Sequence, residues 1–326
     1  MVEVDPFDPK SVPVKRTALG RIQHESATPA VCKDGRVAFY LTDDDRDEYL
    51  FKFVTAKPWN PRDRAANRDL LDEGTLYVAR FEADGTGRWL ELAPGRNGLT
   101  ADKGFATQAD VCLRTRWAGD AAGATPLDRP EWVAIDPTTP GRALVSLTNN
   151  TSRKVDPKNP GANAVNPRAP NRFGHLVRWT EQGGDHAATS FKWEVFVLAG
   201  DPNHADPKER GTQKGDAFAS PDGLLVDARG VVWVQTDMSS DDPKVFGNNA
   251  MLAIDPNTKE ARRFLTGPRG CEISGVTLTP DGRTLFVNIM HPGEGAKSNW
   301  PDQLPGGRPR SATVVVRRND GGVIGT

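Results

Sequence analysis

The sequence of 326 residues lacks the features that mark several common classes of protein. It contains no apolar run of the roughly 18 residues that a membrane-spanning helix needs. Its first residues, MVEVDPFDPKSVPVKR, show neither the apolar segment of a secretory signal peptide nor two adjacent arginines. No segment repeats its apolar residues with a helical period over several turns. We therefore expect no membrane span, no export signal in this stretch and little helix.

The chain also has almost no net charge and only three cysteines. Lysine and arginine number 42 against 43 acidic residues, a formal net charge of -1, so nothing indicates binding to nucleic acid or to a membrane surface. A small phosphorylated molecule stays compatible with this balance, because local clusters of charge need no net charge. Cys32, Cys112 and Cys271 are too widely spaced for a zinc knuckle and allow at most one disulfide. We expect them to be buried as small apolar residues.

The chain is rich in turn-forming residues and in short strand-like runs. Its 32 glycines and 26 prolines separate runs such as VAFYL, WEVFVLA and TLFVNI, which are rich in valine, leucine and aromatic residues. Asp-Gly pairs at 34–35 and 281–282 predict tight turns between two such runs. Only residues 60–74 and 101–123 leave room for short helices. The pattern predicts an all-β fold.

One hairpin pattern recurs four times. Each copy starts with an acidic residue, reaches a turn glycine 8 or 10 residues later, and continues into a strand with a polar end. The acids are Glu25, Glu131, Asp222 and Glu272, and the polar ends are Thr42, Thr148, Thr236 and Asn288.

Further pairs of strand-like runs lie between these hairpins. Examples are EYLFKF with TLYVARF and GHLVRW with WEVFVLAG, so each repeat supplies about four strands. Four antiparallel strands repeated radially are typical of a β-propeller, although a β-sandwich or two stacked barrels would also explain the strands. A Pro/Asn-rich stretch at 152–171 predicts a long loop. A last strand, ATVVVRR, has no following partner, so we expect residues 1–326 to form one propeller domain or part of one.

Equivalent hairpins of a propeller would direct the four acids toward one channel. Carboxylates gathered there would repel one another unless a cation neutralised them, and hard oxygen ligands favour Ca²⁺, Mg²⁺, Mn²⁺ or ferric iron. The alternative is that they are ordinary solvated acids at strand ends. The acidic turn 43–45 could add a ligand or could simply be solvated.

Arg129 precedes Glu131 by two residues. In an extended strand these side chains would share a face, where a guanidinium suits phosphate oxygens. A plain Arg–Glu neighbour pair is the alternative. His24, His175 and His291 stand next to turns or strand ends, where a lone histidine is more often structural.

Seven stretches of the chain resemble the PhoX-type alkaline phosphatase family. They are residues 19–26, 41–54, 123–132, 147–153, 166–179, 220–237 and 270–294. The resemblance implies a six-bladed propeller with ferric iron and calcium ions in its channel, which hydrolyses phosphomonoesters. By motif position it implies metal ligation by Glu25, Asp44, Glu131, Asp222 and Glu272. It also implies that Arg129 contacts phosphate and that Arg129 and Glu131 serve catalysis.

The sequence departs from that family in several places. Family members are about twice as long, carry a twin-arginine export signal, and have an upstream Thr-x-Cys-Glu-Glu motif that this chain does not contain. Gly223 and Met290 stand where asparagine and glutamine are common. We therefore expect an incomplete iron centre, with an N-terminal portion of the same propeller as a missing partner, and leave the localisation open.

Two alternatives to a phosphatase remain at this point. One is a propeller fragment that binds calcium without turnover. The other is a calcium-dependent propeller lactonase, against which the RPEW and NRFGHLVRW stretches argue.

Overall fold

The computed structural model describes residues 1–154, 161–238, 243–295 and 297–326. Part of the loop expected at 152–171, residues 155–160, therefore lies outside the described residues. The chain divides into two compact units. Unit 1 comprises residues 1–130 and 179–193, and unit 2 comprises residues 131–178 and 194–326.

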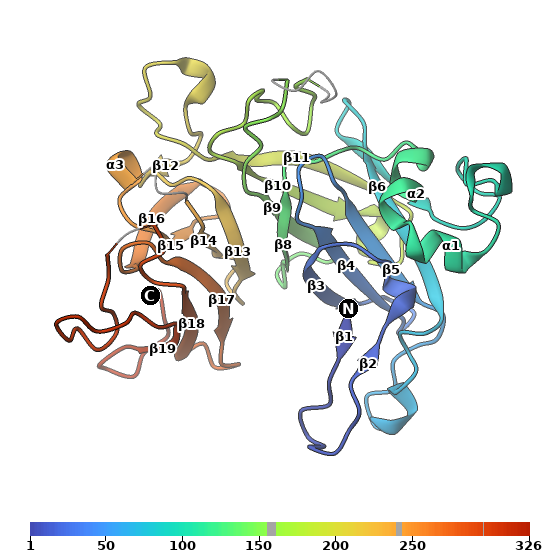
Figure 1. The fold of residues 1–326 in the computed structure, drawn as a ribbon, viewed down its shortest axis with the longest axis horizontal. Coiled ribbons are helices and arrows are strands. Elements are labelled where there is room, and N and C mark those ends of the chain that lie inside the picture. Colours follow the sequence, from blue (N-terminus) through green and yellow to red (C-terminus); the bar gives the residue numbers. More distant parts are fainter. Residues whose placement is uncertain (155–160, 239–242, 296) are drawn as a thin grey trace. The chain divides into compact units, whose positions relative to one another are not determined.

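Unit 1 is built on a meander of antiparallel strands (Figure 1). Each strand pairs with the next one in sequence, and β7 then pairs with residues 190–192 of β11. The strands are β3 (His24–Val31), β4 (Val37–Asp43), β5 (Leu50–Thr55), β6 (Gly74–Phe81) and β7 (Thr86–Glu91). The short strands β1 (Val2–Glu3) and β2 (Val14–Lys15) pair separately. The Asp-Gly turn joins β3 to β4, and Gly35 adopts a φ of 84°, which glycine reaches without steric cost.

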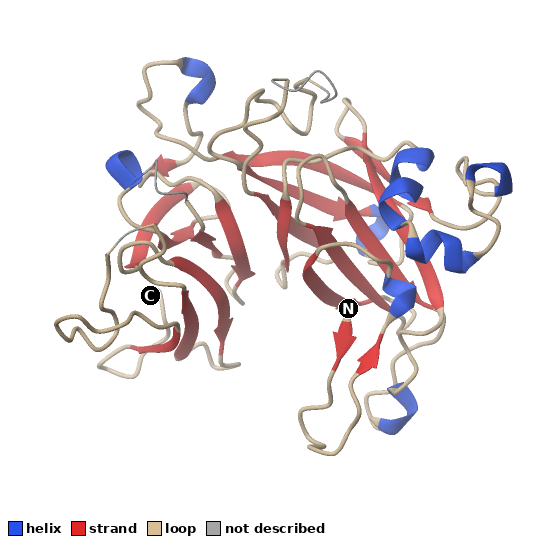
Figure 2. Ribbon diagram, viewed as in Figure 1, coloured by secondary structure: helices blue, strands red, loops and turns tan. Residues whose placement is uncertain are grey.

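Two short helices cover part of this sheet, α1 (Gln108–Leu113) and α2 (Thr115–Ala122). Val111 and Ala118 bury their side chains in one cluster with Phe51, Phe53 and other residues of the strands. A capping box at Thr107 starts α1. The helical expectation for 101–123 is thus confirmed, whereas in 60–74 the only helical segment is a 3-10 helix of three residues, Ala65–Asn67 (Figure 2).

A buried ion pair crosses the sheet of unit 1. Lys52 and Glu181 are fully buried, with Nζ and Oε1 3.3 Å apart. The Tyr40 hydroxyl and the indole nitrogens of Trp89 and Trp179 also donate to Glu181, at 2.8 to 3.3 Å. Burial lowers the pKa of Lys52 to about 8, because desolvation outweighs the charge of Glu181. These four hydrogen-bond donors compensate the charge of Glu181 and so lower the free-energy cost of burying its carboxylate.

Unit 2 carries three further groups of strands. The first contains β8 (Pro130–Ile135), β9 (Arg142–Leu147), β10 (His175–Glu181) and β11 (Ser190–Leu198), and the unit boundary passes through β8, β10 and β11. The second has the order β12 (Lys214–Gly215), β16 (Glu260–Thr266), β15 (Ala250–Ile254), β14 (Val232–Thr236) and β13 (Pro221–Val226). The third joins β17 (Glu272–Leu278), β18 (Thr284–Met290) and β19 (Ala312–Arg317). A single helical turn, α3 (Pro243–Phe246), precedes β15.

The fold class predicted from the sequence is confirmed. The structure is an all-β, propeller-like fold of mainly antiparallel strands, with β12 parallel to β16, and each of the four acid-led hairpins forms two paired strands. ATVVVRR forms β19 and pairs with β18. None of the described helices is long and apolar enough to cross a membrane. The expectation that residues 1–326 form one propeller domain or part of one stays a prediction.

Glu181→Gln should destabilise unit 1 by about 3 kcal/mol, because it leaves the Lys52 ammonium buried without a counter-charge. Glu73→Gln is the matched control, since Glu73 and its partner Lys57 are both largely exposed, and it should change stability by less than about 0.5 kcal/mol. Urea denaturation followed by tryptophan fluorescence would measure both. Equal effects of the two substitutions would contradict a special role for the buried pair.

Candidate metal centre

Two of the acids lie inside irregularities in strand pairing, and a third lies shortly before one. In unit 1 the register shifts between His24 and Ala27, which places Glu25 inside the shift. In unit 2 it shifts between Pro221 and Leu224, around Asp222. On β17 Glu272 is the first paired residue, and the shift follows between residues 274 and 277. Such bulges re-aim side chains and are over-represented beside active sites.

Unit 1 contributes Glu25 and Asp44. A carboxylate oxygen of Glu25 lies within 4.8 Å of one of Asp44, which directly follows β4. Arg129 Nη2 donates to Asp44 Oδ2 at 2.9 Å. The other oxygen, Asp44 Oδ1, is buried and has no hydrogen-bond partner among the described residues. An anionic oxygen in this position is suited to a cation.

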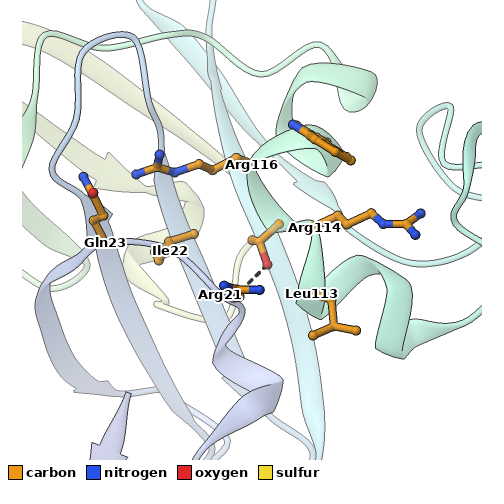
Figure 3. Close-up of a pocket in the computed structure, with 8 residues that line it drawn as sticks. Arg21, Ile22, Gln23, Leu113, Arg114 and Arg116 are labelled. Carbon is orange, nitrogen blue, oxygen red and sulfur yellow. Dashed lines mark hydrogen bonds between the residues drawn. The ribbon is translucent and has the colours of Figure 1, made fainter.

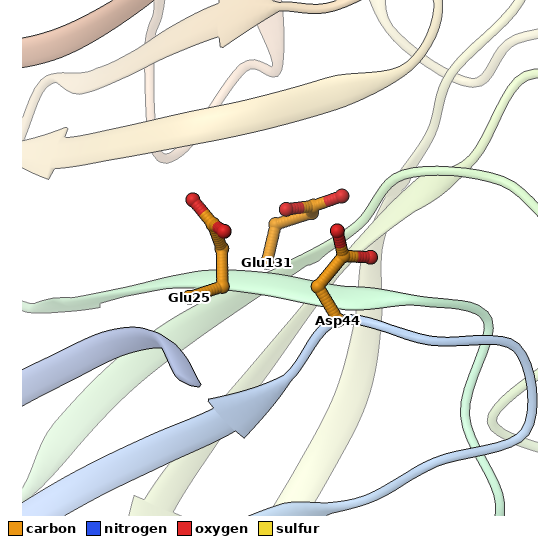
Figure 4. Close-up of side chains that lie close together, drawn as sticks. All are labelled: Glu25, Asp44 and Glu131. Carbon is orange, nitrogen blue, oxygen red and sulfur yellow. The ribbon is translucent and has the colours of Figure 1, made fainter. Parts of the chain in front are cut away.

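Glu131 opens unit 2, one residue after Pro130, and only 3% of it is exposed. Figure 4 shows Glu25 on β3, Asp44 in the segment after β4, and Glu131 on β8. Arg129 and Glu131 do not share one face of an extended strand, so that prediction was wrong. Strand β8 starts only at Pro130, and Arg129 has a left-handed φ of 53°. A non-glycine residue in that conformation is uncommon and marks a locally constrained backbone.

Unit 2 contains a second group of carboxylates. Oxygens of Asp222, Asp237 and Glu272 all lie within 4.8 Å of one another. Asp222 is buried, and the other two are partly buried. Burial raises the pKa of Glu272, and the charge of Asp237 raises it further. Like charges held this close, with restricted access to water, match a site for a hard cation.

Asp237 was missed in the sequence. It directly follows Thr236, the polar end of β14, and its main-chain nitrogen donates to the Ser220 carbonyl at 3.0 Å. Asp44 stands in a similar place after β4. An acid just beyond the second strand of a hairpin was therefore the signal that could have identified Asp237.

A buried serine links the strands of two predicted ligands in unit 2. The Ser146 hydroxyl accepts a hydrogen bond from the Trp132 main-chain nitrogen at 3.0 Å, and it donates to the carbonyl of Asp222 at 2.5 Å. Ser146 is fully buried. Because Trp132 directly follows Glu131, this hydroxyl ties the main chain beside Glu131 to that of Asp222.

Gly223 and Met290, the two positions that depart from the family pattern, have different surroundings. A Cβ atom at Gly223 would come within 2.1 Å of Gln235 Oε1, so the Gln235 side chain occupies the space that a side chain at 223 would need. Met290 is 39% exposed and pairs with Glu272 across the hairpin.

The histidines and cysteines have mainly structural surroundings. His175 is fully buried, and its Nε2 lies 2.7 Å from the Val165 carbonyl. His24 Nε2 lies 3.0 Å from the Gly20 carbonyl. His291 is the exception, because its Nε2 lies 3.2 Å from Glu272. All three cysteines are free. Cys32 and Cys271 are buried as expected, and burial raises the pKa of Cys32 to about 11 and of Cys271 to about 12, whereas Cys112 is only partly buried.

The donor chemistry of both groups fits a metal ion with a preference for oxygen. Among the described residues, the pair in unit 1 (Glu25 and Asp44) and the group of three in unit 2 (Asp222, Asp237 and Glu272) consist of carboxylates, with no thiol. Carboxylate oxygens are preferred ligands of Ca²⁺ and of other hard cations. The carboxylates of each unit are therefore compatible with a bound metal ion.

Comparisons with known proteins agree on the family. The sequence profile described as "Alkaline phosphatase PhoX" matches residues 1–293. The structure of Pseudomonas fluorescens PhoX in complex with vanadate, a transition state analogue, is 47% identical in sequence, with a TM-score of 0.94. That match covers 99% of this chain and 58% of the P. fluorescens chain, so this chain spans little more than half of that protein's length.

A gluconolactonase from Xanthomonas campestris is 12% identical over 80% of this chain and 67% of its own, with a TM-score of 0.30, too low to carry an argument. A search of curated protein sequences found no match. The profile match over residues 1–293 and the 47% identity over nearly the whole chain lead to one conclusion: the chain belongs to the alkaline phosphatase PhoX family.

Proposed function

We propose that this chain hydrolyses phosphomonoesters by the metal-dependent chemistry of the PhoX family. The observation that carries the proposal is 47% identity, over 99% of this chain, to a protein whose structure was solved with vanadate. Vanadate mimics a phosphoryl group in transfer, so a small phosphorylated molecule is the proposed substrate.

The proposed metal ligands are Glu25 and Asp44 of unit 1 and Glu131, Asp222 and Glu272 of unit 2, to which we add Asp237. Support comes from the packing of like-charged carboxylates within 4.8 Å in each unit and from the partnerless, buried Asp44 Oδ1. Calcium and ferric iron are the proposed ions, because both prefer hard oxygen ligands. Bound ions would polarise the phosphoryl oxygens and neutralise the charge that develops on them.

Arg129 is the proposed phosphate-binding residue. Its guanidinium, 28% exposed, is bonded to Asp44 and therefore oriented before substrate arrives. A planar guanidinium binds two phosphate oxygens at once, which orients the ester and stabilises charge on it. Glu131, nearly buried two residues later, is the proposed catalytic partner through its ligation of a metal ion.

A calcium-binding propeller without turnover is the second candidate. It is favoured by Gly223, which follows Asp222, and by Met290, which pairs with Glu272, because neither supplies a polar side chain beside those proposed ligands. The lactonase alternative is set aside, because the family match is to a phosphatase.

Asp222→Asn and Asp237→Asn should each weaken calcium binding by at least tenfold, since each removes one anionic ligand from a group of three. Isothermal titration of the metal-free protein with Ca²⁺ would measure the loss. Asp255→Asn is the matched control, because Asp255 accepts hydrogen bonds from its own turn and lies outside both groups. Wild-type affinity in both test variants would show that these carboxylates hold no calcium.

Glu131→Gln should lower kcat for p-nitrophenyl phosphate at alkaline pH by about 100-fold or more, since it removes a charge that holds the metal centre. The assay uses protein loaded with Ca²⁺, with and without Fe³⁺. If the wild-type chain shows no metal-dependent turnover, the phosphatase proposal fails for this chain. Stabilisation of that inactive protein by calcium would then support the second candidate.

Arg129→Lys should mainly raise KM, by roughly tenfold, because an ammonium cannot form the two parallel hydrogen bonds of a guanidinium. Steady-state kinetics with the same ester would separate KM from kcat. Arg142→Lys, a partly buried arginine whose ion pair is with Asp136, is the control. An unchanged KM in Arg129→Lys would remove Arg129 from the phosphate site.

A further inference from the structure

Arg116, on α2, reaches from the helix to the loop that carries Asp44. Its Nε lies 2.7 Å from Asp43 Oδ2 and its Nη2 lies 2.6 Å from Asp43 Oδ1, a two-pronged ion pair. A weaker contact of 3.4 Å joins Nη1 to Asp45. In Figure 3 the guanidinium of Arg116 points to the opposite side from that of Arg114, its neighbour on the same segment.

Asp43 receives this guanidinium in a fully buried position. Its Oδ1 also accepts a hydrogen bond from the Gln23 main-chain nitrogen at 3.0 Å. The carboxylate therefore joins α2 to the segment that leads into β3. A buried carboxylate of this kind depends on its partner, because removal of the guanidinium would leave its charge uncompensated.

Gln23, which is bonded to Asp43, also holds Asp44 in place. The main-chain nitrogen of Asp44 donates to the Gln23 carbonyl at 3.1 Å, and Gln23 Nε2 donates to the Asp44 carbonyl at 2.9 Å. Both main-chain polar groups of Asp44 are thus held by one residue. Glu25 lies only two residues beyond Gln23, so the same contacts restrain the main chain before both acids.

We propose that Arg116 is a positioning residue of the metal centre, which acts through Asp43 and Gln23 on Asp44 and Glu25. The inference rests on the proposed function for its metal, while the chain of contacts lies within unit 1 and involves only described residues. Hydrogen-bonded partners behind metal ligands commonly set ligand orientation, and their loss costs ten- to hundredfold in metal affinity or activity.

A cavity beside Arg116 makes a direct test possible. It has a volume of about 480 Å³ and is lined by Arg116, Gln23, Ile22 and Trp117, among others. Arg116→Ala would remove the guanidinium and leave this cavity open to solvent. Millimolar ethylguanidinium could then enter and bind Asp43 as the native side chain does, whereas ethylammonium, with the same charge, could not make the two-pronged contact.

The first measurement uses metal-free protein. Amide hydrogen exchange at Gln23 and Asp44 should speed up at least tenfold in Arg116→Ala, and ethylguanidinium should restore most of the protection. The control is Arg114→Ala, whose guanidinium donates instead to the Gly104 carbonyl and whose exchange at these amides should match wild type. Unchanged exchange in Arg116→Ala would overturn the proposal, whether or not the protein binds metal.

The second measurement is calcium affinity by titration calorimetry. We expect Arg116→Ala to raise the Kd for Ca²⁺ ten- to hundredfold and ethylguanidinium, but not ethylammonium, to reverse it. Arg116→Lys should lie between wild type and Arg116→Ala. A folded variant with faster exchange but wild-type calcium affinity would make Arg116 a purely structural clamp and overturn the positioning role.

If Arg116→Ala does not fold, the double variant Arg116→Met with Asp43→Asn removes both charges and the penalty of a lone buried carboxylate. Its calcium affinity should stay ten- to hundredfold weaker, and wild-type affinity would overturn the proposal. A wild-type protein that binds no calcium would contradict the proposed function instead, and the exchange measurement would still decide the contacts of Arg116.

Discussion

Repulsion between neighbouring carboxylates is the constraint on which the rest of this structure depends. Asp222, Asp237 and Glu272 hold oxygens within 4.8 Å of one another. Two unit charges at that separation repel by about 3.5 kcal/mol at an effective dielectric constant near 20. The main chain must therefore hold the three acids in place against this repulsion. It does so through strand pairing, through register shifts near the acids, and through buried hydrogen bonds such as that from Ser146 to Asp222. A cation would convert this repulsion into attraction.

Two carboxylates of unit 1, Glu181 and Asp44, differ in how their charge is compensated. Glu181 is surrounded by donors and paired with Lys52, which suits a purely structural ion pair inside the sheet. Asp44 is treated differently, since one of its oxygens meets Arg129 and the other has no partner among the described residues. The contrast separates a carboxylate satisfied by the protein itself from one whose remaining oxygen is available to a ligand.

The strand-rich character, the turns and the acid-led hairpins could be anticipated because they depend on local sequence. Asp-Gly pairs, short β-rich runs and the recurring acid define hairpins within single short stretches of sequence, and the structure reproduces these hairpins. The conformation of Arg129 could not be anticipated, since its left-handed φ contradicts the extended strand that alternation favoured. Residues 60–74 show the same limit, because only a 3-10 helix of three residues, Ala65–Asn67, forms there, and none of its residues is buried.

The sequence by itself determined the all-β class, the hairpin repeat and, through long motifs, membership of the PhoX family. Local pattern suffices for these, since strands and turns depend on residues close in sequence. Only the tertiary structure decided which acids meet. Asp237 joins Asp222 and Glu272 although 15 and 35 residues separate them, and Arg116 reaches Asp43 across 73. Contacts of that range depend on register and packing, which no short stretch of sequence encodes.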